Sequence, residues 1–233
     1  MTNDPQLKAV LFDLDGVLVD TSQLHADAWA QLARSVGAQP PADIKDRVRG
    51  ISRIESLKIA LGDLATRYSD QELHDLAAQK NSRYLDMIKQ LTPDDLLPGV
   101  MALFDDLDSA GIKIVLCSAS KNAKAVLRAV GILDCFDAIA DGHSYKCGKP
   151  HPDVFWTGAR MLGLTPAECV VVEDAAAGIT AALDGGFVAI GMGHPELLRH
   201  AHHLIDDLTD LDADLLRQIH ARFADDLEKK EQG

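Results

Sequence analysis

Basic residues are in short supply in this sequence. Its 233 residues include 23 lysines and arginines against 36 aspartates and glutamates, a formal net charge of −13. This surplus of negative charge opposes nonspecific binding to the phosphates of nucleic acids and to anionic membrane surfaces. We therefore expect neither a nucleic acid nor a membrane as a partner, and a site for a phosphate group must be built locally.

Long apolar runs and paired cysteines are also missing. No stretch approaches the roughly 20 apolar residues of a membrane span or the apolar core of a secretory signal, which predicts a cytoplasmic protein. The four cysteines include no C-x-x-C pair. Their spacing therefore favours reduced thiols over a zinc site or a redox motif.

Hydrophobic residues make up 47% of the chain, enough for one large domain or two modest ones. From Pro98 onward, helical and strand periodicities alternate, a pattern typical of a parallel α/β sheet. We expect strands over 112–117, 136–140, 169–172 and 188–190, and helices over 122–130 and 154–162.

Residues 21–91 follow a different pattern. Leu24, Ala28 and Leu32 repeat with helical spacing, as does the stretch 72–88, and no convincing strand is present. We predict a Rossmann-like parallel-sheet core, residues 1–20 and 92–233, with an inserted helical domain over 21–91. The chain crosses between the two near 20–22 and 92–99, so these segments are candidate hinges.

Two acids follow the first apolar run. The expected strand over 10–12 leads into Asp13 and Asp15, and Gly16 comes next. Alternate side chains of an extended segment lie on one side, so one carboxylate can attack a phosphorus atom while the other moves a proton. The same spacing recurs elsewhere in this acidic chain, where a solvated surface explains it, but without a preceding apolar run or a following glycine.

Further polar groups follow the later strands. Ser118 and Ser120 come after the second strand, Lys149 lies in a loop after the third, and Glu173 and Asp174 follow the fourth. Ligands of open parallel sheets bind beyond these strand ends. Clustered carboxylates need a cation, and Mg²⁺ takes carboxylate oxygens together with a substrate phosphate. The pattern predicts phosphoryl transfer with Mg²⁺, Lys149 and the Ser118 hydroxyl around the phosphate.

Several of these residues also have simpler explanations. Ser120 or Asn122 could cap the helix that follows, and Lys149 could be a surface lysine. The stiff segment G-K-P-H-P-D over 148–153 favours a functional Lys149. The apolar run directly before Glu173 and Asp174 argues against two ordinary surface acids.

The motifs resemble those of a known superfamily. D-L-D-G-V-L at 13–18, Ser118, G-K-P at 148–150 and E-D at 173–174 are similar, in order, to the four motifs of the haloacid dehalogenase superfamily, and the helical insert stands where its cap domain stands. A closer resemblance is to the β-phosphoglucomutase family. It is carried by D-T at 20–21, His25, Trp29, R-G-I-S-R at 49–53, Q-K-N at 79–81 and S-A-S-K-N at 118–122.

The resemblance implies a role for each residue. Asp13 would be the nucleophile that becomes an aspartyl phosphate, and Asp15 the general acid and base. Asp13, Glu173, Asp174 and the Asp15 carbonyl would form the magnesium site. The implied substrate ligands are Ser118, Ser120, Asn122 and Lys149 in the core, and His25, Trp29, Arg53 and Lys80 in the cap.

Within the cap, the resemblance implies that Arg53 holds the distal phosphate and that His25 and Lys80 help to close the site. Without it, His25 would be taken for a histidine on a helix surface.

The implied reaction interconverts β-D-glucose 1-phosphate and glucose 6-phosphate, with β-glucose 1,6-bisphosphate as primer and intermediate. A sugar-phosphate phosphatase on the same core is the alternative. The second acid, Asp15, argues against a dehalogenase, and the intact acid pair argues against a catalytically idle sugar-phosphate sensor. The loop 141–147 departs from the family's sequence and leaves the sugar preference open. We expect a monomer that acts on a small sugar phosphate.

Overall fold

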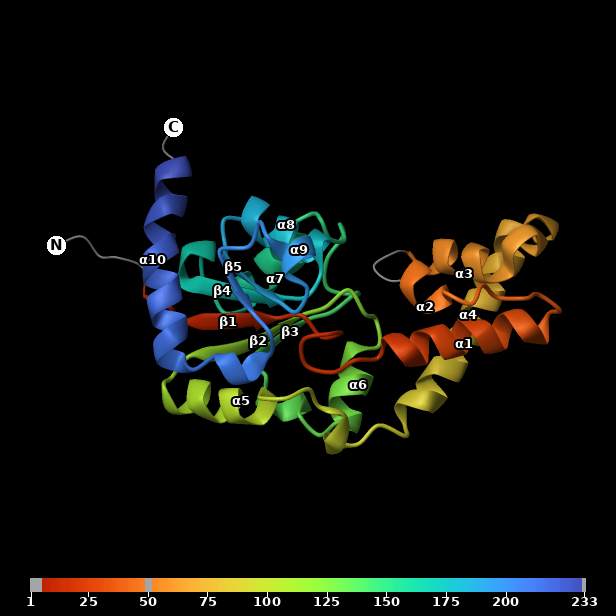
Figure 1. Ribbon diagram of the computed structural model, residues 1–233, viewed down its shortest axis with the longest axis horizontal. Coiled ribbons are helices and arrows are strands. Elements are labelled where there is room, and N and C mark those ends of the chain that lie inside the picture. The colour runs from red at the N-terminus through yellow and green to blue at the C-terminus, as the bar shows by residue number, and fades with distance from the viewer. Residues whose placement is uncertain (1–5, 49–51, 232–233) are drawn as a thin grey trace. The chain divides into compact units, whose positions relative to one another are not determined.

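The computed structural model describes residues 6–48 and 52–231 (Figure 1). The chain forms two compact units: unit 1, Met1–Asp20 with Thr92–Gly233, and unit 2, Thr21–Leu91. Within the described part of the chain, no helix is long and apolar enough to cross a membrane.

Unit 1 is built on a six-stranded sheet in the order β3-β2-β1-β4-β5-β6, with every pairing parallel. The strands are β1 Ala9–Phe12, β2 Lys113–Cys117, β3 Ala138–Ala140, β4 Cys169–Glu173, β5 Val188–Met192 and β6 His203–Ile205. The chain builds outward from β1 to β2 and β3, and later adds β4 on the other side of β1. The carboxyl end of β1 is therefore the topological switch point at which such sheets bind ligands. The predicted parallel α/β fold with an inserted helical domain is confirmed.

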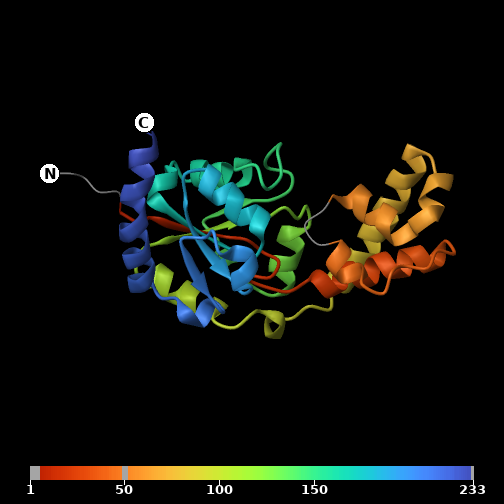
Figure 2. The same ribbon diagram turned by 45° about the horizontal axis from the view of Figure 1, so that its top comes forward.

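Helices cover both faces of this sheet, as Figures 1 and 2 show. The α-helices of unit 1 are α5 Val100–Ser109, α6 Ala123–Ala129, α7 Asp153–Met161, α8 Ala176–Asp184, α9 Pro195–Leu198 and α10 Ala213–Glu231. Short 3₁₀ turns are η2 Pro93–Asp95, η3 Leu133–Cys135, η4 Pro166–Glu168 and η5 Leu208–Asp210.

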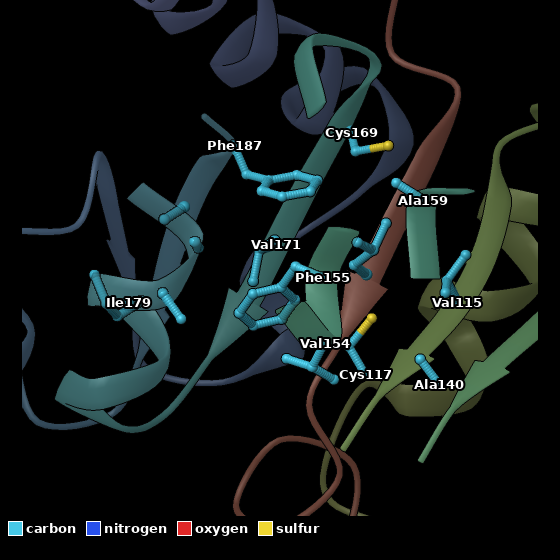
Figure 3. Packing of buried hydrophobic residues seen from close by; sticks show 14 of the residues in the cluster. Val115, Cys117, Ala140, Val154, Phe155, Ala159, Cys169, Val171, Ile179 and Phe187 are labelled. Carbon is cyan, nitrogen blue, oxygen red and sulfur yellow. The ribbon is translucent and has the colours of Figure 1, made fainter. Parts of the chain in front are cut away.

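Alternation along the strands decides which side chain meets which helix. Val115 and Val171 belong to one buried cluster with Phe155 of α7 and Ile179 of α8 (Figure 3). Phe12 packs against Phe104 of α5, with ring centroids 5.3 Å apart. Both faces of the strands are thus apolar, as expected for a parallel sheet covered on two sides.

The two chain crossings are tied together where they leave unit 1. Val19 forms an antiparallel bridge with Leu96, and the N–H of Leu97 donates to the carbonyl of Leu18 at 2.9 Å. Backbone hydrogen bonds therefore hold the beginning of one candidate hinge beside the end of the other.

Unit 2 consists of helices, with no strand among its described residues. They are α1 Ser22–Ser35, α2 Ile44–Arg47, α3 Arg53–Leu61, the 3₁₀ helix η1 Gly62–Arg67 and α4 Asp70–Ile88. Ser52 with Glu55, and Ser69 with Glu72, form capping boxes that start α3 and α4. An apolar core including Trp29, Leu57 and Leu73 joins α1, α3 and α4.

We expect Gly99→Ala to destabilise the protein more than Gly111→Ala. Both glycines have positive φ, +85° at Gly99 and +71° at Gly111. A Cβ added at Gly99 would lie 2.5 Å from backbone atoms of Leu208 and Thr209, whereas a Cβ added at Gly111 would meet no neighbouring atom within 4 Å. The left-handed conformation alone should cost about 1 kcal/mol of unfolding free energy at Gly111, and the clash should bring the loss at Gly99 to about 3 kcal/mol. Urea unfolding measures both, and equal losses would show that the Leu208–Thr209 backbone yields freely.

Candidate active site

Three carboxylates meet at the switch point. Asp13 directly follows β1, and its N–H donates to the carbonyl of Val172 at 3.1 Å, which extends the pairing with β4 by one residue. Glu173 is the last residue of β4, and Asp174 follows it. One carboxylate oxygen from each acid lies within 4.8 Å of the others. Asp13 and Glu173 are buried and Asp174 is half-buried.

Lys149 reaches these acids from the loop before α7. Its Nζ donates to Asp13 Oδ1 at 2.6 Å, to the carbonyl of Cys117 at 3.1 Å and to Glu173 Oε2 at 3.4 Å. It also lies 4.9 Å from the ring centroid of Phe155. Burial alone would lower the pKa of Lys149, but the charges of Asp13 and Glu173 outweigh burial and raise that pKa, so the lysine is a permanent cation.

Glu173 lies in an environment that disfavours its negative charge. Burial raises its pKa well above the usual value, and the negative charges of Asp13 and Asp174 raise it further, against the opposing effect of Lys149. Its carboxylate also fills the space beside α8, where a Cβ on Gly178 would lie 1.8 Å from Glu173 Oε1. Gly178 is therefore required for Glu173 to take this position.

The predicted substrate ligands after β2 form a hydrogen-bonded turn. Ser118 is buried, and its Oγ accepts from the N–H of Ser120 at 3.0 Å. Ser120 Oγ accepts in turn from the N–H of Asn122 at 3.2 Å. Asn122 stands at the N-cap of α6 but makes no capping bond with its side chain. Ser120, rather than Asn122, thus satisfies a backbone donor where the helix begins.

Asp15 lies in the turn that follows Asp13. Asp15 bridges to Val19, Gly16 has φ of +82°, and the N–H of Gly16 donates to the carbonyl of Val19 at 2.8 Å. The Asp15 carboxylate is not a member of the group formed by Asp13, Glu173 and Asp174. Its implied contribution to a metal site, through its carbonyl, stays a prediction.

Tyr145 is a neighbour of the site that the sequence did not reveal. It lies half-buried in the divergent loop 141–147 and donates from its hydroxyl to the carbonyl of Ser118 at 3.4 Å. Burial raises the pKa of Tyr145, with Lys149 acting against it and Asp13 with it. Its signal in the sequence was a single aromatic residue in a polar loop, which does not distinguish a site residue from a packing residue.

The four predicted cap residues all lie in unit 2, and three of them are in contact through Lys80. Lys80 is buried, and its Nζ lies 2.7 Å from Nδ1 of His25 and 4.6 Å from the ring centroid of Trp29. Tyr84 completes the cluster, with its ring 4.7 Å from Lys80 Nζ and stacked on His25 at 4.0 Å. Because an ammonium group only donates, Nδ1 of His25 accepts and its proton lies on Nε2.

Arg53, the fourth predicted cap residue, is exposed at the start of α3. Its Nη2 donates to Asn81 Oδ1 at 3.1 Å, which links α3 to α4 beside Lys80. Residues 49–51 of the R-G-I-S-R motif lie outside the described residues.

Comparisons with known proteins identify the family. Residues 7–186 match the haloacid dehalogenase-like hydrolase family. A β-phosphoglucomutase of Bacillus subtilis is 42% identical over 214 residues, covering 91% of this chain and 95% of that protein. The chain belongs to the β-phosphoglucomutase family of haloacid dehalogenase-like hydrolases. A crystal structure of β-phosphoglucomutase from Clostridium difficile agrees, with a TM-score of 0.86 and 38% identity over 93% of this chain and 98% of that one.

Phosphatases are among the relatives of this β-phosphoglucomutase family member. Hexitol phosphatase A of Escherichia coli is 33% identical over 81% of this chain and 84% of its own length. The fold and the motifs of the core are therefore compatible with two outcomes of one chemistry, transfer of a phosphoryl group to a sugar or to water.

We expect unit 2 to lose stability in mild acid through His25. Burial, followed by the charges of Lys80 and Arg53, lowers the pKa of His25 from 6.5 to about 3. Below pH 6.5 His25 is protonated in the unfolded chain but stays neutral in the folded chain. Stability that is present at neutral pH is therefore lost as the pH falls. Between pH 7 and 5 the wild type should lose about 2 kcal/mol more than His25→Gln.

Urea unfolding followed by fluorescence measures this difference. The chain has two tryptophans, so a Trp156→Phe background leaves Trp29 of unit 2 as the reporter. His74→Gln, which removes an exposed histidine of α4, is the matched control and should keep the wild-type slope. A His25→Gln variant with the wild-type slope would contradict a neutral, half-buried His25.

Proposed function

We propose that this protein interconverts β-D-glucose 1-phosphate and glucose 6-phosphate through an aspartyl-phosphate enzyme and β-glucose 1,6-bisphosphate. The observation that carries the proposal is the 42% identity to the Bacillus subtilis β-phosphoglucomutase. Because that match covers 91% of the chain, it includes most of the helical unit 2 as well as the core. The core alone would not separate a mutase from other enzymes with these motifs.

Asp13 and Asp15 divide the covalent step between them. The Asp13 carboxylate attacks the phosphorus, its new O–P bond forms as the bond to the departing sugar oxygen breaks, and Asp15 gives that oxygen a proton. In the reverse direction Asp15 takes the proton from the attacking sugar hydroxyl. Asp13 is held for attack by its hydrogen bonds to Lys149 and Val172.

The phosphoryl oxygens would be held by Lys149 and Ser118. Lys149 is a permanent cation beside Asp13, and Ser118 Oγ already accepts from Ser120, which leaves its own hydroxyl proton for the phosphate. In the same turn, Ser120 and Asn122 are proposed to contact the sugar.

Asp13, Glu173 and Asp174 fit a magnesium ion. All three offer oxygen atoms, the ligands that Mg²⁺ prefers, and one lysine among three carboxylates leaves negative charge for a cation to offset. When bound, Mg²⁺ would supply positive charge that stabilises the phosphoryl oxygens during transfer. We propose the Asp15 carbonyl as a further ligand of the ion.

We propose that the helical unit meets the requirements that distinguish a mutase from a phosphatase. A mutase must keep water from the aspartyl phosphate and hold a bisphosphate by its second phosphate while it turns round. We propose Arg53 for that distal phosphate, because a guanidinium is a permanent, fork-shaped phosphate ligand. His25, Lys80 and Trp29 would form the preorganised surface that closes over the sugar.

We expect transfer to sugar to exceed transfer to water. With β-glucose 1-phosphate, Mg²⁺ and a bisphosphate primer, glucose 6-phosphate should form at least about tenfold faster than inorganic phosphate, because the sugar hydroxyl is held near the aspartyl phosphate while water is excluded. A coupled dehydrogenase assay and a phosphate assay on the same sample measure the two rates.

Asp13→Asn is the control for this assay, and it should yield neither product because the amide is a poor nucleophile. If inorganic phosphate were the main product of the wild type, the mutase proposal would give way to a sugar-phosphate phosphatase, and phosphatases such as hexitol phosphatase A are among the relatives.

Arg53→Ala should affect turnover of the sugar phosphate but not hydrolysis of a small phosphate at the core. We expect kcat/KM for β-glucose 1-phosphate to fall at least about tenfold, since a charged phosphate contact is lost, while hydrolysis of acetyl phosphate, which has no second phosphate, stays within about twofold. Lys58→Ala removes another exposed cation of α3 and should change neither rate. An equal loss on both substrates would count against Arg53 as the distal-phosphate ligand.

A further inference from the structure

A second group of metal-ligating side chains lies outside the carboxylate site. Cys147, His151 and Asp153 each place one ligand atom so that all three atoms lie within 4.8 Å of one another. Cys147 and His151 are exposed, and Asp153 is half-buried as the first residue of α7. The proposed phosphoryl transfer uses none of the three.

The backbone between these residues is folded back on itself. Asp153 Oδ2 accepts from the N–H groups of Lys146 at 2.9 Å and Cys147 at 3.1 Å, and the N–H of His151 donates to the carbonyl of Gly148 at 3.0 Å. Within the described part of the chain, no donor reaches the other oxygen of Asp153. The turn therefore brings a thiol, an imidazole and a carboxylate close together, and one oxygen of that carboxylate accepts neither backbone hydrogen bond.

These three donors suit a cation different from the one expected at Asp13. Magnesium prefers oxygen ligands alone, whereas sulfur, imidazole and carboxylate together suit Zn²⁺. A tetrahedral zinc ion holds its ligand atoms about 3.3–3.6 Å apart, so ligand atoms within 4.8 Å of one another need only modest side-chain rotations to bind it. We propose that Cys147, His151 and Asp153 form a site for a thiophilic divalent cation such as Zn²⁺, with water as the fourth ligand.

The imidazole has one interaction that a cation would have to replace. Nδ1 of His151 accepts from the N–H of Asp153 at 3.2 Å, and the imidazole ring is nearly perpendicular to the Trp156 ring, with centroids 5.8 Å apart. A zinc ion bound at Nδ1 would exchange this long hydrogen bond for a metal bond. The site flanks Lys149, so a bound cation would brace the segment that carries the lysine to Asp13.

Alkylation of the thiols tests the site without depending on turnover. The full-length protein is treated with iodoacetamide in excess Mg²⁺, with and without Zn²⁺, and each cysteine is followed by peptide mass spectrometry. Zn²⁺ should slow the alkylation of Cys147 at least about tenfold, because a metal-bound thiolate is a poor nucleophile. Cys135, a half-buried thiol in η3, is the internal control and should react at an unchanged rate.

Two variants assign the effect to the site. His151→Ala should remove most of the protection of Cys147, while His143→Ala, which removes another exposed histidine of the preceding loop, should keep it. Circular dichroism of both variants checks that α7 and the rest of the fold are retained. Alkylation of Cys147 at one rate with and without Zn²⁺ overturns the proposal, as does protection that survives in His151→Ala or that extends equally to Cys135.

Discussion

Lys149 brings its ammonium group to the edge of the sheet where two buried acids lie side by side. Pairing of β1 with β4 forces Asp13 and Glu173 together, and their mutual repulsion and burial would be costly without a cation. Lys149 offsets part of that cost through bonds to both carboxylates. The negative charge that remains with Asp174 suits a divalent cation. One electrostatic balance thus links the residues proposed as nucleophile, metal ligands and phosphate ligand.

The two units hold a buried lysine in different ways. Lys149 of the core is paired with carboxylates, which keep it charged despite its burial. Lys80 of the helical unit contacts the lone pair of His25 and the faces of Trp29 and Tyr84. Burial, followed by the charge of Lys80, lowers the pKa of His25, so that histidine is a fixed acceptor rather than a residue that titrates near neutral pH. This arrangement suits a preorganised wall of a binding site better than a proton carrier.

Sequence patterns predicted five of the six strands of unit 1 but missed the sixth strand and the long helix α10. The strand expected over 169–172 is β4, which extends one residue further so that Glu173 itself lies in the ladder. The strand β6 was not predicted, because its three residues, His203 to Ile205, include no alternating run. The helix α10 was not predicted either. Tyr145 escaped notice because the loop that holds it has no period and no motif.

The amino-acid sequence alone was enough to predict the short-range features. It set apolar runs that end in acids, a lysine in a stiff turn, and a helical insert, since each depends on neighbours within a few residues. Pairing between distant segments places β1 between β2 and β4, which brings Asp13 to Lys149 and Glu173 across 136 and 160 positions of the chain. The tertiary structure also brings Cys147 close to His151 and Asp153, which the spacing of the cysteines does not reveal. Strand order and turn closure rest on hydrogen bonds and packing between segments, and no local pattern of residues records these contacts.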